Sequence, residues 1–192
     1  MTALLAAALL AAPPALTAEQ QQQILSAFAP GDAPAGLQVL GSIPDGKATV
    51  VFACGTGAKA RPLVARFEGG ALRGDPVEVG EPLASCGAIA LSQPFTIRAP
   101  GQPARSAVVA TWNDAGKALL TAAVTLEPRV LAWTTAEPPA GGQAIVPLAR
   151  GRAAAAALCV RQADGAWDTV SWQEAAGAWE SGAGPCKPPQ RK

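Results

Sequence analysis

The feature that most constrains this chain is a pattern of apolar runs joined by short polar bends. In residues 106–127 a valine-rich run leads into the bend Asn113–Gly116, and a second apolar run follows. Within 119–126, alternate residues are apolar and two of those between them are threonines. A period of two indicates a strand with one face toward a core, and Asn, Asp and Gly favour a hairpin bend. The pattern therefore predicts antiparallel strands.

Similar patterns occupy residues 48–70 and 155–177, so three units begin about 50 residues apart. Residues 88–98 and 144–148 are candidates for the fourth strand of the first and second unit. We expect an all-β fold, an antiparallel meander of about 10–12 short strands that forms a sandwich or a barrel. The alternative is a propeller-like arrangement of three four-stranded units.

The N-terminus has the form of a secretory signal. An apolar run, too short to span a bilayer, leads into small residues and then a polar segment. We expect residues 1–18 to be a signal peptide that is removed after Ala18; an N-terminal anchor or a buried helix is the alternative. Residues 19–36 are then a short helix, over 19–28, and a linker.

The four cysteines lie far apart in the sequence, and the chain contains no histidine. Metal sites usually place cysteines in close pairs with histidine nearby, whereas an even number of cysteines in an exported chain indicates disulfides. We expect Cys54 to pair with Cys86 and Cys159 with Cys186, because each bond then closes a loop within its own unit. Each bond constrains the unfolded chain by about 3–4 kcal/mol in the loop-entropy model.

Composition places the chain among exported globular proteins. Charged residues make up 15% and hydrophobic residues 49%, which excludes a disordered chain, and the net charge of +1 comes without a basic cluster for nucleic acid. After signal removal no segment is long and apolar enough to span a membrane. We expect a periplasmic or extracellular protein with a single β domain at 37–186 and a disordered basic tail at 187–192. The sequence leaves the oligomeric state open.

The residue types that are absent restrict the possible chemistry. Without His or Tyr, and with its cysteines paired, the chain lacks the usual nucleophiles, general bases and soft metal ligands. We therefore expect a protein that is not an enzyme, with no catalytic residues, no metal and no cofactor. A carboxylate-based hydrolase is a less favoured alternative, because it needs two acids about 5–9 Å apart and no motif indicates such a pair.

The five tryptophans divide into two groups. Trp112, Trp133 and Trp172 continue apolar strands, so we expect them in the core. Trp167 and Trp179 adjoin turns and have carboxylates beside them. Exposed rings next to polar side chains are typical of sugar-binding surfaces.

We therefore expect a non-catalytic binding or structural role, with a protein or a glycan as the partner. The alternative is a carbohydrate-binding module that uses the third unit. Its possible ligand-binding residues are Trp167, Trp179, Asp164, Asp168 and Glu180.

Overall fold

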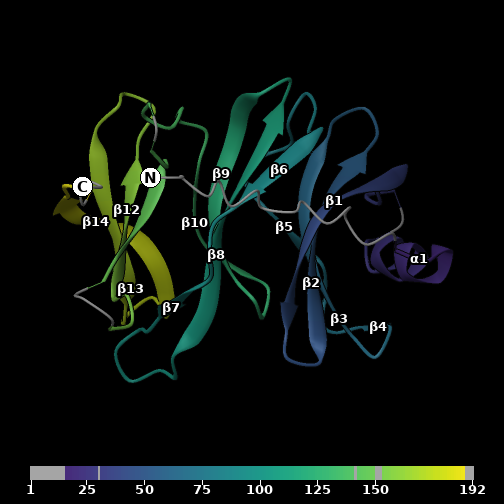
Figure 1. Cartoon of the computed structure of the whole chain (residues 1–192), viewed down its shortest axis with the longest axis horizontal. Coiled ribbons are helices and arrows are strands. Elements are labelled where there is room, and N and C mark those ends of the chain that lie inside the picture. Colours follow the sequence, from purple (N-terminus) through teal and green to yellow (C-terminus); the bar gives the residue numbers. More distant parts are fainter. Residues whose placement is uncertain (1–15, 30, 141, 150–152, 189–192) are drawn as a thin grey trace, which may run out of the picture.

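The computed structural model describes residues 16–29, 31–140, 142–149 and 153–188. Within these residues the chain forms one short helix and fourteen strands, which confirms the all-β prediction. Two of the strands, β4 and β5, are only two residues long, so the number exceeds the expected ten to twelve. The strands form three antiparallel sheets that follow one another as layers along the molecule (Figure 1).

The first sheet has the order β1-β2-β3-β4, and β5 also pairs with β3. Its strands are β1 (Gly36–Asp45), β2 (Ala48–Thr56), β3 (Arg61–Glu68), β4 (Ala71–Leu72) and β5 (Val77–Glu78). The turn between β3 and β4 is formed by Gly69 and Gly70, which both have positive φ.

The second sheet has the order β10-β9-β8-β6, and β7 also pairs with β8. Its strands are β6 (Ala88–Leu91), β7 (Phe95–Ile97), β8 (Arg105–Asp114), β9 (Lys117–Thr125) and β10 (Arg129–Thr134). The predicted hairpin joins β8 to β9 through Ala115 and Gly116. Both residues have positive φ, +47° and +81°, as a two-residue hairpin turn of the primed type requires.

The third sheet has the order β11-β12-β13-β14. Its strands are β11 (Ile145–Leu148), β12 (Ala157–Arg161), β13 (Trp167–Gln173) and β14 (Ala178–Pro185). A bend that contains Asp164 and Gly165 joins β12 to β13. There the Asp164 carboxylate accepts a hydrogen bond from the Ala166 N–H at 2.9 Å.

The three units are real, but each begins earlier than the sequence pattern suggested, by one strand in the first and third sheets and by two in the second. Residues 88–98 contain β6 and β7, which open the second sheet, and residues 145–148 form β11, which opens the third. The strand at 36–45 opens the first sheet. Short strands flanked by prolines pair equally well at either end of a sequential meander, so local pattern alone does not assign them to a sheet.

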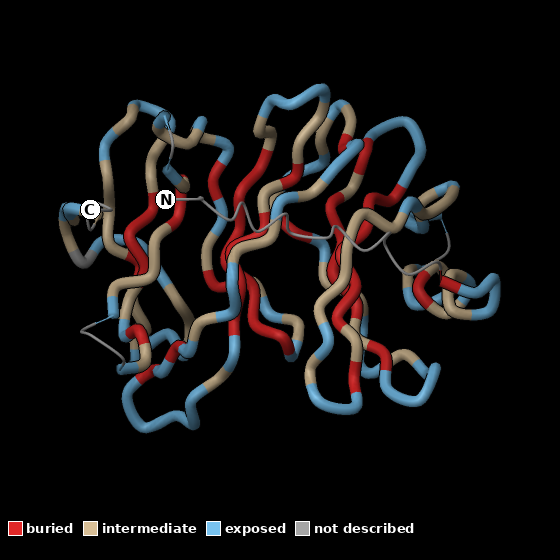
Figure 2. The backbone as a smooth tube through the Cα atoms, in the orientation of Figure 1, coloured by how far each residue is buried: buried red, intermediate tan, exposed pale blue. Residues whose placement is uncertain are grey.

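The sheets stack face to face, and the core between the first and second sheets contains large side chains. Phe52 of β2 and Trp112 of β8 are both fully buried there, with ring centroids 6.2 Å apart. Leu120 of β9 and Leu126, which directly follows β9, complete this layer. Figure 2 shows the buried residues concentrated within the strands and the exposed residues mainly in the turns that join them.

The core between the second and third sheets contains no fully buried aromatic side chain among the described residues, and β8 and β9 contribute smaller residues to it. The second sheet contributes Ala107, Val109 and Ala123, and the third contributes Ile145 and Leu158. This difference follows from the period of two along β8 and β9, whose opposite faces carry different residues.

The helix α1 (Ala18–Ser26) covers the outer face of the first sheet, as the position of the ribbon in Figure 1 shows. This confirms the predicted helix, which is capped by Thr17 through reciprocal hydrogen bonds with Gln20. Leu16 and Ile24 are buried against the sheet. No helix in the described residues is long and apolar enough to cross a membrane.

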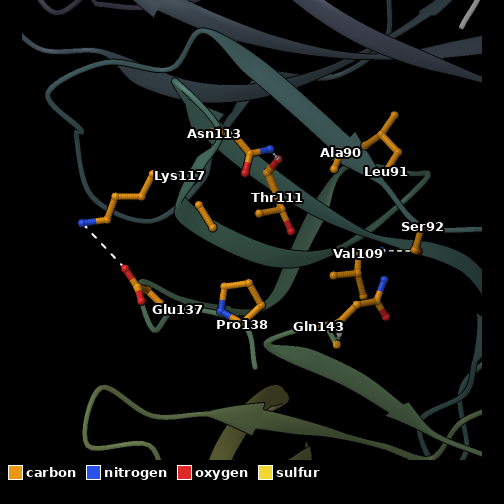
Figure 3. A pocket seen from close by; sticks show the side chains of 13 residues that line it. Ala90, Leu91, Ser92, Val109, Thr111, Asn113, Lys117, Glu137, Pro138 and Gln143 are labelled. Atoms are coloured by element: carbon orange, nitrogen blue, oxygen red, sulfur yellow. Dashed lines mark hydrogen bonds and ion pairs between the residues drawn. The ribbon is translucent and has the colours of Figure 1, made fainter. Parts of the chain in front are cut away.

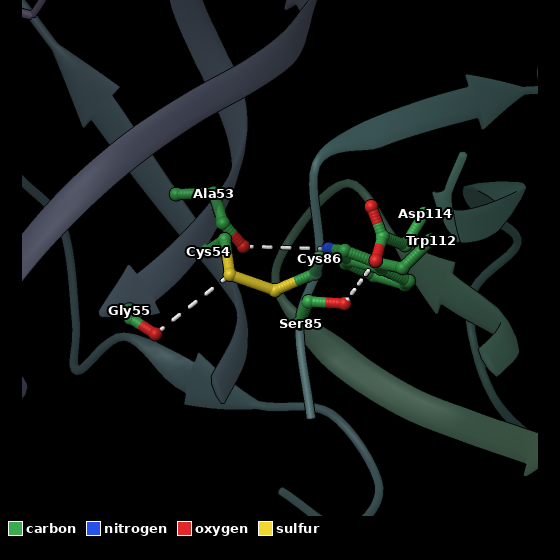
Figure 4. The surroundings of a disulfide bond; sticks show 7 residues. All are labelled: Ala53, Cys54, Gly55, Ser85, Cys86, Trp112 and Asp114. Carbon is green, nitrogen blue, oxygen red and sulfur yellow. Dashed lines mark hydrogen bonds between the residues drawn. A yellow bond between two sulfur atoms is a disulfide. The ribbon is translucent and has the colours of Figure 1, made fainter. Parts of the chain in front are cut away.

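Both predicted disulfides, Cys54–Cys86 and Cys159–Cys186, are present. The first does not stay within its own sheet, because Cys86 lies in the segment that leads into β6 (Figure 4). Beside it, the Trp112 indole N–H donates a hydrogen bond to the Ala53 carbonyl at 3.3 Å. This disulfide and hydrogen bond together tie the first sheet to the second.

The tryptophans expected in the core behave differently from one another. Trp112 is fully buried and Trp172 is half-buried, but Trp133 is 42% exposed, so its prediction was wrong. Trp133 lies on β10, the edge strand of the second sheet, where its ring packs over Gly80. A ring on an edge strand has a neighbouring strand on one side only. Trp112 lies on β8, which has neighbouring strands on both sides.

Candidate binding groove

A groove lies beside the third sheet, on the face of the second sheet that the third sheet covers only in part. On β8, Val108, Ala110 and Trp112 face the first sheet, while Val109 and Thr111 point to the opposite side. The third sheet packs against that side through contacts of β10 with β12 and β14 and of β9 with β11. The end of the face near the β8–β9 hairpin is left open.

The groove has a volume of about 470 Å³, within the range of small-molecule and peptide-sized sites. Its floor is formed by β6, β8 and the start of β9, and its wall by the segment between β10 and β11 (Figure 3). The lining residues are Ala90, Leu91, Ser92, Val109, Thr111, Asn113, Gly116, Lys117, Ala118, Glu137, Pro138, Gly142 and Gln143.

Most polar groups on the floor already have partners within the protein. The Ser92 hydroxyl accepts a hydrogen bond from the Val109 N–H at 2.9 Å, and the Thr111 and Thr121 hydroxyls are 3.1 Å apart. The Asn113 amide donates to the Thr111 carbonyl at 2.9 Å, which orients its side-chain oxygen. No described residue hydrogen-bonds the Gln143 side chain, so its amide is available to a ligand.

Charge is confined to the rim of the groove and is balanced. Lys117 Nζ lies 3.7 Å from Glu137 Oε1, and both side chains are about 70% exposed. Such a pair contributes little to stability, but it places one charge of each sign at the entrance. A neutral ligand therefore fits the groove better than a strongly charged one.

The groove lacks the groups for hydrolysis by paired acids. Of its lining residues, all of which the structure describes, Glu137 is the only one with a carboxylate. Elsewhere in the described residues no three His, Cys, Asp or Glu side chains are grouped to hold a metal.

Trp179 packs mainly within the protein. Its ring makes an edge-on contact with Trp172, with centroids 6.3 Å apart, and the Arg129 guanidinium lies 5.6 Å from the Trp172 ring. The cavity beside this cluster has a volume of about 40 Å³. That is well below the size of ordinary ligand pockets.

Trp167 lies on the opposite face of the third sheet from Trp179. In the regular pairing of β12 with β13, Trp167 is opposite Arg161 and Val170 is opposite Leu158. Val170 and Leu158 belong to the core, so the alternation of side chains places Trp167 on the outer face.

The three predicted carboxylates are also dispersed. Asp164 lies in the β12–β13 turn and lines a separate open cavity, and Asp168 accepts a hydrogen bond from the neighbouring Thr169 N–H. Glu180 is exposed on β14. The structure therefore does not bring the five predicted ligand residues together at one site.

The residues that line the groove gave no signal in the sequence. Thr111 and Asn113 belong to the strand and bend that predict a hairpin, which is a structural pattern. Gln143 lies in a Pro- and Gly-rich connector, and its position is set by long-range packing of two sheets.

Comparisons with protein-family models, with curated proteins and with solved structures find no match to this chain.

Proposed function

We propose that the protein is a non-catalytic binding protein whose ligand site is the groove on the second sheet. The observation that supports this most is the composition of the groove. It combines an open volume of about 470 Å³ with hydroxyl and amide groups on its floor and wall, and it holds a single carboxylate. Such a surface recognises a ligand by hydrogen bonds and shape, and it has no group poised for acid–base chemistry.

We also propose that the protein works outside the cytoplasm. The two disulfides indicate an oxidising, exported environment. The apolar N-terminal residues 1–15 lie outside the described residues, and on the sequence pattern they form most of a signal peptide. Expression of the full chain in a bacterial host, followed by cell fractionation and intact mass measurement, tests this. Recovery of the uncleaved chain from the cytoplasm would contradict it.

The binding proposal is tested by recording ¹H–¹⁵N correlation spectra of the full chain during titration with neutral oligosaccharides and with short neutral peptides. The expected result is a saturable shift of the backbone amides of Thr111 and Asn113 and of the side-chain amide of Gln143. A panel that leaves all of these signals unchanged would contradict the proposal.

A matched pair of variants separates a direct role of the groove from a general effect. Gln143→Ala removes the free amide in the groove and should weaken binding by roughly tenfold, as expected for one or two lost hydrogen bonds. Gln22→Ala makes the same change at an exposed position of α1, far from the groove, and should leave binding unchanged.

A further inference from the structure

The strand β6 forms an edge of the second sheet directly beside the groove. It pairs with β8 on one side, and the strand order places no described strand on its other side. Ala90 and Leu91 of β6, together with the following Ser92, line the groove.

The phase of the β6–β8 hydrogen bonds shows which backbone groups lie at the free edge. The Ser92 N–H donates to the Val109 carbonyl at 2.9 Å, in register with the pairing of Ala90 to Thr111. In an antiparallel sheet, residues whose backbone groups bond the neighbouring strand alternate with residues whose backbone groups point away from it. The N–H and C=O groups of Ala90 therefore also point toward β8, whereas those of Ile89 and Leu91 point away from it. Because β8 is the only described strand that pairs with β6, these four groups have no strand partner among the described residues.

The other sheet edges among the described residues are blocked in ways that β6 is not. β1 and β11 contain Pro44 and Pro147, β10 and β14 have register shifts, and β4 and β5 have two residues each. The end of β7 is occupied by a bridge from Ile97 to Ala155. By contrast, β6 has the sequence Ala-Ile-Ala-Leu, without proline, glycine or charge. Natural proteins rarely leave such an edge uncovered unless it pairs with something.

We propose that an extended polypeptide segment of a partner protein adds to the second sheet along β6 and places alternate side chains in the groove. Main-chain hydrogen bonds to Ile89 and Leu91 would supply affinity, and the groove would select the side chains. This inference rests on the proposed function, because it names the class of ligand that the groove binds.

The size and charge of the site favour a peptide segment over a second copy of this chain. Edge-to-edge pairing of two four-residue strands buries far less than the roughly 1,200 Å² of a stable interface. A single strand, in contrast, contacts both the edge and the groove of about 470 Å³. The balanced Lys117–Glu137 pair at the rim suits a segment with small or neutral polar side chains.

The test begins with a phage-displayed library of random linear nonapeptides, panned on the immobilised full chain. A synthetic copy of an enriched sequence then serves as the probe, and its affinity is measured for two variants. Leu91→Pro removes the free N–H at the edge, and its control Leu91→Ala loses the same side chain but keeps the N–H. Because Leu91 does not donate to β8, both variants should retain the native circular dichroism spectrum.

The expected result is an affinity at least about tenfold lower for Leu91→Pro than for Leu91→Ala, since a main-chain hydrogen bond is lost and the ring obstructs the edge. In the unsubstituted protein, the bound peptide should also slow hydrogen exchange at the amides of Ile89 and Leu91. This slowing distinguishes strand addition from binding to the groove alone.

The remaining outcomes separate this inference from the proposed function. Equal peptide binding by the two Leu91 variants, with loss in Gln143→Ala, would leave the groove as the site but overturn strand addition. If oligosaccharides bind in the groove but panning enriches no peptide, the groove also remains the site and strand addition is overturned. A concentration-dependent dimer that Leu91→Pro abolishes would assign the edge to a second copy. If neither oligosaccharides nor peptides bind to the groove, both proposals are overturned.

Discussion

The two interfaces of the second sheet differ in the size of the residues that form them, and that difference determines where a groove exists. Toward the first sheet, β9 presents Leu120 and Val124, Leu126 follows directly after it, and the interface closes around Trp112. Toward the third sheet, the same strand presents Thr121, Ala123 and Thr125. Small and hydroxyl-bearing residues bury less apolar area, so this second interface covers only part of the face.

The largest expected effect comes from truncating the large residue that distinguishes the first interface. Trp112→Ala should lower the free energy of unfolding by about 3–5 kcal/mol, because it leaves a cavity and removes the hydrogen bond to Ala53. Urea denaturation followed by circular dichroism measures this. Trp112→Phe keeps most of the ring volume and should cost much less. A loss below about 1 kcal/mol for the alanine variant would mean that the interface does not depend on this side chain.

The disulfides provide the next comparison, because one crosses the first interface and the other stays within the third sheet. Removing either pair, as Cys54→Ala with Cys86→Ala or as Cys159→Ala with Cys186→Ala, should cost about 3–4 kcal/mol, since their sequence separations of 32 and 27 are similar. Amide hydrogen exchange should distinguish the two double variants. Loss of the first pair should raise exchange across the first and second sheets, and loss of the second mainly in β14. Identical exchange patterns would argue against this assignment.

A smaller effect is expected where α1 covers the outer face of the first sheet. Gln23→Ala removes the side-chain oxygen that accepts a hydrogen bond from the Leu72 N–H, and it should lower the free energy of unfolding by about 1 kcal/mol. Gln22→Ala, the same change at the exposed neighbouring position, is the control, and thermal unfolding compares the two. If both variants melt at the same temperature, this contact between the helix and the sheet contributes nothing measurable.

The smallest effect is expected at the turn beside the groove. Ala115 has a φ of +47°, a conformation that asparagine tolerates better than alanine. Ala115→Asn should therefore raise the free energy of unfolding by about 0.5–1 kcal/mol, measured by urea denaturation. Ala58→Asn, at an exposed loop position, should have no such effect. A destabilised Ala115→Asn variant would show that the turn is not strained.

Sequence reasoning found the parts of the fold that depend on local chemistry. The β8–β9 hairpin followed from alternation and a polar bend, and the helix followed from the local sequence pattern of residues 19–28. Both disulfides followed from the wide spacing of the cysteines. Each of these signals depends on residues that are close in sequence or on a single chemical property.

The groove and the exposure of Trp133 depend on how sheets stack, which no local pattern reports. The apolar surroundings of Trp133 and Trp112 look alike in the sequence, yet one ring lies on an edge strand and the other on an inner strand. The tryptophan-based hypothesis failed to locate a shared site for a similar reason. Trp167 and Trp179 are close in sequence, but the pleat of the third sheet sends them to opposite faces.

The position of Cys86 has a consequence for the order of events when the chain emerges N-terminus first. Both partners of the first disulfide precede the second sheet, so that bond is able to close before the third sheet has left the ribosome or the translocation channel. The second bond must wait for Cys186, near the end of the chain. The Cys54–Cys86 bond is therefore able to form before Cys159 emerges, and this order disfavours a non-native bond between Cys54 and Cys159.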